Sequence, residues 1–311
     1  MMKKAEWHPS LKKTFKGCEA WWQTSMIARN KREAESTRLH ADLSKEGTFR
    51  TDASTLMILA QTYCTEACIV SQRGNADEIS APLRHGVAIR SLDFLKIATR
   101  TYASDKTTLL TPLWTSMMAI GPTMLSDWEH GALCAYYMIQ LAHKDMRINH
   151  PSIRKDGWGK GTNDAFLVFL LSQAYNIETH FESVSPMIDP YRHLLGVWRS
   201  SDQAEFQSAM KDAAEYHITR SKDGTDKNKY EFENYFDRVF PGELLAVQAL
   251  RRRDDLPEFQ SGHLLVDTPW TMIRDLPACE PHPLAASLEN RLRSEAPELW
   301  QRYRQEISDP G

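Results

Sequence analysis

The chain has 311 residues, and its 38 Lys and Arg against 41 Asp and Glu give a net charge of −3. Apolar residues make up 41% and charged residues 25%, which is the balance of an ordinary globular protein. This slightly acidic chain has no overall basic field for nucleic acid or for anionic lipid, so neither is expected as a partner.

The N-terminal region and the cysteines bear on location. The first 17 residues contain charges but no apolar run of signal-peptide length. Nowhere do about 18 apolar residues follow one another, so no membrane-spanning helix is expected. The five cysteines are odd in number and sit mostly in apolar contexts, which suits a reducing cytoplasm better than a disulfide framework. We therefore expect a cytoplasmic protein.

Apolar residues recur with a period near 3.6 along almost the whole chain, which predicts an all-α protein. The expected architecture is a multi-helix bundle or a set of stacked helical hairpins. In the N-terminal half, helices are predicted over residues 51–70, with Asp52 or Ser54 as the cap, and over residues 83–102. Ser126 and Glu129 have capping-box spacing and predict a helix through about residue 142.

The C-terminal half continues this pattern. Asn163 or Asp164 is expected to begin an apolar helix, and Asp202 with Glu205 predicts a second capping box for a helix towards residue 220. Residues 222–229 are a polar loop. Further signals come from prolines: Pro241 fits the first turn of a helix through about residue 253, prolines at 257, 269, 277, 281 and 283 indicate an irregular stretch, and a last helix over residues 285–307 is interrupted or restarted at Pro297.

Residues 149–162 are rich in Gly and Lys and mark a candidate boundary. This boundary would divide the chain into an N-terminal helical part, 1–150, and a C-terminal helical part, 151–311. A long loop within one continuous domain is the alternative.

No residue set forms a convincing catalytic, cofactor or metal site. Cys64 and Cys68 would share a helix face, but a partner pair of zinc ligands is absent, so a buried apolar pair is preferred. The segment from Asp254 to Glu258 resembles an aspartate-rich magnesium motif, but Pro257 breaks the helical turn that such a motif needs. A helix end with solvated acids is the better interpretation.

His217 is followed in the chain by three glutamates, at positions 231, 233 and 243. A histidine with several carboxylates could build a metal or acid–base site. However, Glu231, Glu233 and Asp237 alternate with aromatic residues, which suggests an amphipathic helix with an acidic outer face. A hydrogen-bonded core or interface histidine is therefore the preferred interpretation of His217.

Several short motifs together resemble a known group of proteins. They are Tyr216-His217, Tyr230-Glu231-Phe232, Phe240 to Leu245, His263-Leu-Leu and Thr268-Pro-Trp270, preceded by Leu83-Arg84, Leu92 to Leu95 and Met124 to Glu129. The pattern covers about two-thirds of the chain and resembles helical immunity proteins encoded beside bacterial polymorphic or type VI secreted toxins. The nearest group is the immunity protein 49 family, and the immunity proteins of PoNe-type nuclease toxins are similar in their C-terminal helices.

The resemblance implies a binding protein with no chemistry of its own. It would dock on a cognate toxin in the cytoplasm and block the toxin's active site. Acidic side chains that face a basic toxin would accelerate association. The candidate partner-binding residues are Glu231, Glu233, Asp237, Asp254, Asp255 and Glu258; the alternative is that they form the solvated faces of two helices.

Two other classes of function stay open. A helical scaffold or adaptor that binds another protein would show a groove between stacked helix pairs. An all-α enzyme would need acids or histidines that point into a cavity. An exposed apolar seam would serve either a homodimer or the toxin, and helical periodicity does not separate these two uses.

Overall fold

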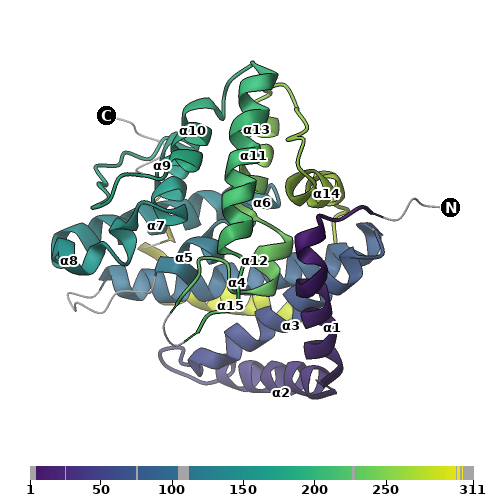
Figure 1. The fold of residues 1–311 in the computed structure, drawn as a ribbon. Coiled ribbons are helices and arrows are strands. Elements are labelled where there is room, and N and C mark those ends of the chain that lie inside the picture. The colour runs from purple at the N-terminus through teal and green to yellow at the C-terminus, as the bar shows by residue number, and fades with distance from the viewer. Residues whose placement is uncertain are drawn as a thin grey trace.

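The computed structural model describes residues 5–24, 26–74, 76–103, 112–225, 228–298, 300, 301 and 303. These residues form fifteen α-helices and no strand (Figure 1), so the all-α prediction is confirmed. The α-helices are α1 (Lys12–Thr24), α2 (Met26–Leu43), α3 (Ala53–Ser71), α4 (Ala76–Ala103), α5 (Pro112–Ala119), α6 (Gly121–Met124), α7 (Trp128–Ile148), α8 (Pro151–Arg154), α9 (Asn163–Tyr175), α10 (Asp189–Val197), α11 (Gln203–Arg220), α12 (Tyr235–Val239), α13 (Gly242–Arg253), α14 (Leu264–Ile273) and α15 (Pro283–Glu295). Two 3-10 helices, η1 (Pro9–Leu11) and η2 (Trp158–Lys160), complete the set.

Helices α3 and α4 pack against each other as a hairpin, and α4 also contacts α5, α6, α7 and α15 (Figure 1). Asp52 caps α3, because its side chain accepts a hydrogen bond from the Ser54 backbone N–H at 2.8 Å. The two helices lie close together at Gly86, where a Cβ atom would come within 2.7 Å of the Cys64 Sγ. Both helices carry buried apolar residues, among them Leu56, Leu59 and Ala67 of α3 and Leu83, Leu92 and Leu95 of α4.

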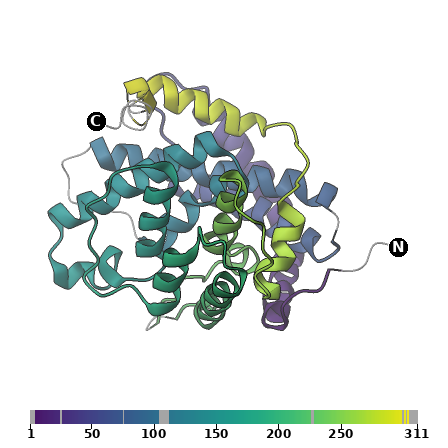
Figure 2. The same ribbon diagram turned by 90° about the horizontal axis from the view of Figure 1, so that it is seen from above.

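The other helices cover the hairpin on two sides (Figure 2). On one side, α15 crosses α2 and α4. On the other, α7 packs against α4, α9 against α7, α10 against α9, and α11 against α10. The result is a layered bundle in which α4 and α7 have neighbours on both sides.

Both halves of the chain contribute to one cluster of buried apolar residues. The start of α13 lies against α5 and α6, since a Cβ at Gly242 would lie 2.9 Å from the Ile120 Cγ2 and 3.5 Å from the Met117 Cε. The candidate boundary at 149–162 contains α8 and η2, and its Trp158 belongs to the same cluster. This segment is therefore a connection within a shared core.

Helix starts agree with the sequence in most cases. Asp202 caps α11 by accepting from the backbone N–H groups of Ala204 and Glu205, as predicted. The capping-box prediction for α7 is wrong by one residue: Ser126 has a φ of 60°, in the left-handed region, and Asp127 is the cap. The helix also continues to Ile148, beyond the predicted end.

The proline-rich stretch is less irregular than predicted. Helix α14 forms within it and includes Pro269, although a proline in a helix removes one backbone hydrogen bond. Burial of Val266, Trp270 and Ile273 provides packing that offsets this loss. The last predicted helix begins at Pro283 and α15 ends at Glu295; residues 304–307 lie outside the described residues.

None of the helices formed by the described residues combines the length and apolar character needed to cross a bilayer.

Candidate functional site

His217 and Glu243 form a hydrogen-bonded pair in the interior, between α11 and α13. The His217 Nδ1 lies 2.6 Å from the Glu243 Oε1, and both side chains have 0% exposure. Tyr191 of α10 donates its hydroxyl to the same glutamate oxygen at 3.2 Å. The Phe232 ring stacks on the imidazole with a centroid distance of 3.7 Å. The pair therefore joins three helices through one carboxylate.

Glu231 lies in the same part of the interior and is surrounded by donors. Lys160 donates to its Oε1 at 2.9 Å, Tyr216 donates to the same atom at 3.3 Å, and Arg220 donates to its Oε2. Burial alone would raise the pKa of Glu231, but the hydrogen bonds from Arg220 and Lys160 outweigh it and hold the pKa below its usual range. Glu231 is therefore a structural anion with two cationic partners.

Asp164, in the first turn of α9, is also buried. Burial raises the pKa of its carboxyl to about 7, although the Ser116 hydroxyl and the charge of Lys160 act in the opposite direction. Neither carboxyl oxygen has a hydrogen-bond partner among the described residues. Glu231 adds to the rise by its negative charge. Asp164 thus lacks the pair of cations that Glu231 has, and it holds its proton near neutral pH.

These groups lie in the interior of the protein, away from solvent. The side chains of His217, Glu231 and Glu243 all have 0% exposure. Within the described part of the chain, no three His, Cys, Asp or Glu side chains come together to hold a metal ion. Cys64 and Cys68 are buried and free, in agreement with the prediction of an apolar pair.

Two of the six candidate partner-binding acids are not exposed, which corrects the expected acidic outer face. Glu231 is paired in the interior as described above. Asp237 is 4% exposed and binds Arg90 of α4 through two hydrogen bonds of 2.6 and 2.7 Å. Both carboxylates already have partners within the chain, because an unpaired charge at such a position would be costly. Neither can contact a toxin in this structure.

The other four acids lie nearer the surface but do not form one acidic face. Glu233 is half-buried and accepts the Tyr230 backbone N–H at 2.8 Å. Asp254 ends α13 and pairs with Arg253 at 2.8 Å. Asp255 and Glu258 follow and are exposed, so the prediction of a helix end with solvated acids is confirmed.

Exposed arginines lie among these acids, and sequence reasoning missed their arrangement. Arg252 pairs with Asp275 at 2.8 Å and with Glu258 at 3.7 Å, and Arg274 pairs with Asp275 at 3.1 Å and with Glu258 at 4.0 Å. We call these four residues the charged patch; they bring together the C-terminal ends of α13 and α14. Their side chains are 42 to 61% exposed. In the sequence, only the arginine run 251–253 pointed to this patch. The run gives no indication that the end of α14 lies beside it.

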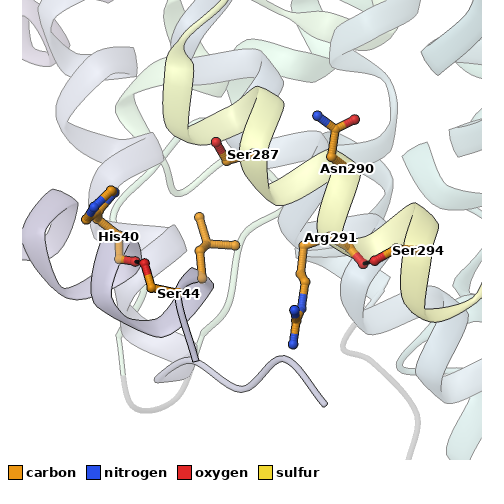
Figure 3. A pocket seen from close by; sticks show the side chains of 7 residues that line it. His40, Ser44, Ser287, Asn290, Arg291 and Ser294 are labelled. Atoms are coloured by element: carbon orange, nitrogen blue, oxygen red, sulfur yellow. Dashed lines mark hydrogen bonds between the residues drawn. The ribbon is translucent and has the colours of Figure 1, made fainter. Parts of the chain in front are cut away.

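A polar hollow lies elsewhere on the molecule, between α2 and α15 (Figure 3). It is lined by His40, Leu43, Ser44, Ser287, Asn290, Arg291 and Ser294. The Arg291 guanidinium points towards the segment after α2 and donates to the backbone carbonyls of Lys45 and Gly47. Since this cation is engaged in joining α15 to that segment, the hollow offers mainly small neutral side chains.

Comparison with known proteins found no protein-family model, no curated protein and no solved structure that matches the chain.

Proposed function

We propose that the chain is an immunity protein, which binds a cognate secreted antibacterial toxin in the cytoplasm and blocks the toxin's active site. The observation that carries the proposal is the charged patch. It presents two arginines and two carboxylates at the surface, and each of them pairs with other members of the patch. A toxin with complementary charges would exchange these pairs for its own.

Replacing the ion pairs within the patch by ion pairs with a toxin is energetically feasible. Exposed ion pairs contribute about 0 to 1 kcal/mol each, so opening the patch costs little. Arginine is enriched in protein interfaces because its planar group forms several hydrogen bonds and packs well. Complementary charge also accelerates the encounter of two proteins. The patch could therefore contribute charged contacts to a docking surface once its own ion pairs open.

The resemblance to immunity proteins supports the same proposal. Its C-terminal motifs lie on α11, α13 and α14 and in the segment between α11 and α12, and many of their residues are buried. Those motifs include the His217–Glu243 pair, which is buried and so supports a scaffold in preference to an active site. The charged patch lies at the C-terminal ends of α13 and α14, and the buried residues of these helices hold it in place.

The direct test is a rescue of growth. The C-terminal domain encoded by the adjacent upstream reading frame is expressed in the cytoplasm of a laboratory bacterium, with and without this chain. We expect growth to collapse with the neighbour alone and to recover with both. A neighbour that stays lethal beside well-folded chain contradicts the immunity proposal, and so does a harmless neighbour. The adaptor alternative would then be preferred.

A charge-reversal variant tests the docking surface. We expect Arg252→Glu with Arg274→Glu to abolish rescue while the circular dichroism spectrum stays unchanged, because both side chains are at the surface. The matched control is Arg73→Glu with Arg192→Glu, which reverses two exposed, ion-paired arginines elsewhere. Rescue by the patch variant at the level of the control would exclude the charged patch as the docking surface.

A further inference from the structure

A second hollow lies between the end of α4, the C-terminal half of α7 and the segment that follows α9. Its volume is ≈ 470 Å³, within the range of about 300 to 1,000 Å³ that is typical of small-molecule sites. It is lined by Tyr102, Gln140, His143, Lys144, Met146, Arg147 and His180. No carboxylate is among these described lining residues.

The two histidines of this hollow are held in a fixed arrangement. Their rings stack with a centroid distance of 3.8 Å and an interplanar angle of 18°. The His143 Nε2 accepts the His180 backbone N–H at 3.3 Å and lies 3.0 Å from the Thr179 hydroxyl. An amide N–H can only donate, so the Nε2 carries no proton and the ring proton is on Nδ1. The ring of His143 therefore contributes an N–H donor.

Burial, together with the neighbouring charge of His180, lowers the pKa of His143 to about 4. His143 is consequently a neutral donor at physiological pH. The cations come from its neighbours on α7. Lys144 is buried and donates to the Thr101 carbonyl, which fixes its ammonium group, and Arg147 is exposed at the edge.

Every polar side chain that lines the hollow can donate a hydrogen bond, and two of them carry a permanent or near-permanent positive charge. The carboxylate on α7 nearest in sequence, that of Asp145, is bound to Arg154 at 2.6 Å. A set of donors without an acceptor-only side chain is complementary to an oxyanion, which only accepts. The volume exceeds what a single phosphate fills, and the Tyr102 ring and the Met146 thioether add an apolar wall.

We propose that this hollow binds a small organic phosphate, with the phosphoryl group at Arg147, Lys144 and the histidine pair and the organic part against Tyr102 and Met146. The site is separate from the charged patch and does not depend on the immunity proposal.

The test is calorimetric titration of the full chain with phenyl phosphate, inorganic phosphate and phenol. Phenyl phosphate supplies both the anion and the ring, and the other two probes each supply one of them. We expect phenyl phosphate to bind more tightly than inorganic phosphate, and phenol to bind at least tenfold more weakly than either. No measurable binding of either phosphate at millimolar concentration would overturn the proposal. Equal affinity for the two phosphates would overturn the assignment of an organic ligand.

Two double variants test whether phenyl phosphate binds in this hollow. Arg147→Gln with His180→Gln removes the guanidinium charge and one of the two stacked imidazole rings, both from exposed residues, and should weaken phenyl phosphate binding at least tenfold. The matched control, Arg192→Gln with His193→Gln, changes an exposed arginine and an exposed histidine on α10 and should leave the affinity unchanged. Equal affinity in the two double variants would place the phosphate elsewhere and overturn the proposal.

Discussion

Three buried carboxylates illustrate how the interior accommodates acidic side chains. Glu231 has two cationic partners, Asp237 has two hydrogen bonds with Arg90, and the Asp164 carboxyl has no hydrogen-bond partner among the described residues. Coulombic attraction and hydrogen bonds offset the cost of removing a charge from water only when the partners are close. Glu231 stays ionised on this account, and Asp164 takes up a proton as the pH falls below about 7.

Replacement of Asp164 by asparagine tests this difference. Since burial raises the pKa of Asp164 to about 7, the folded state binds more protons than the unfolded state between about pH 4 and pH 7. The contribution of this group to stability is therefore present at low pH and is lost as the pH rises through 7. Asparagine does not titrate. We therefore expect the free energy of unfolding of Asp164→Asn, relative to that of the parent, to increase by a few kcal/mol between pH 5 and pH 8.

Urea unfolding at a series of pH values measures this gain. The exposed Asp212→Asn serves as the control and should show no such slope. A constant difference between Asp164→Asn and the parent across pH 5 to 8 would mean that Asp164 is ionised throughout.

At the scale of secondary structure, an uncharged histidine, His282, joins the start of helix α15 to Tyr63 of α3. The His282 Nδ1 caps the helix by accepting the Leu284 N–H at 3.2 Å, and its Nε2 lies 2.8 Å from the Tyr63 hydroxyl. Burial, followed by the charges of His85 and Arg32, lowers the pKa of His282 to about 4. The capping role requires the unprotonated Nδ1, so α15 depends on a histidine that stays neutral.

The variant His282→Asn should lose less stability than the parent when the pH is lowered. Because the folded-state pKa is lowered, the unfolded state binds the proton first, and the stabilising effect of His282 is complete above about pH 6.5 and lost as the pH falls through 4. Asparagine caps a helix without titrating. Between pH 7 and pH 4 we expect the variant to lose roughly 1 to 2 kcal/mol less than the parent. Thermal unfolding followed by circular dichroism checks this, and parallel curves for the two proteins would contradict it.

Two glycines in helices predict opposite effects of the same substitution. Gly242→Ala places a methyl group 2.9 Å from the Ile120 Cγ2, so overpacking should cost about 1 to 3 kcal/mol. Gly196 of α10 has no atom within 4 Å of the added carbon, so Gly196→Ala should stabilise by about 0.5 to 1 kcal/mol. Urea midpoints of both variants give the comparison. A stable Gly242→Ala protein would show that α6 can move away from α13.

The sequence predicts these elements unequally well. The start of α11 follows from the Asp202 cap, which is a local feature. Helix α9 begins at Asn163 as predicted, although Thr162 at its cap position makes no side-chain hydrogen bond, and α13 begins at Gly242, one residue after Pro241. Helix α14 was not predicted, because the prolines were given more weight than its apolar residues. Burial of these apolar residues in the folded protein stabilises the helix. The start of α7 shifted to Asp127 because two neighbouring residues could both cap it.

The whole molecule is expected to unfold as one unit, since both halves share one buried cluster. Urea unfolding followed by tryptophan fluorescence and by far-ultraviolet circular dichroism should give coincident transitions. Residues 1–150 and 151–311, expressed separately, should not fold, because each would expose the surface that the other buries. Two separate transitions, or a folded fragment, would support the division near residues 149–162.

Contacts between distant residues explain why the site prediction was only partly right. The pattern around Glu231 and Asp237 indicated an acidic outer face, but their partners Lys160 and Arg90 lie 71 and 147 residues away in the sequence. The spacing of residues within one helix carries no information about such partners. The ends of α13 and α14 were equally hard to connect, because the ion pairs of the charged patch depend on how the two helices are placed.

The pairing of Arg90 with Asp237 also has a consequence for synthesis on the ribosome. The 147 residues between them take roughly 7 to 30 s to translate at about 5 to 20 residues per second. During that interval its native partner Asp237 is not yet made, and burying the guanidinium alone would be strongly unfavourable. The α3–α4 hairpin therefore emerges with Arg90 still hydrated, and Arg90 can form its native pair only after α12 has left the ribosome.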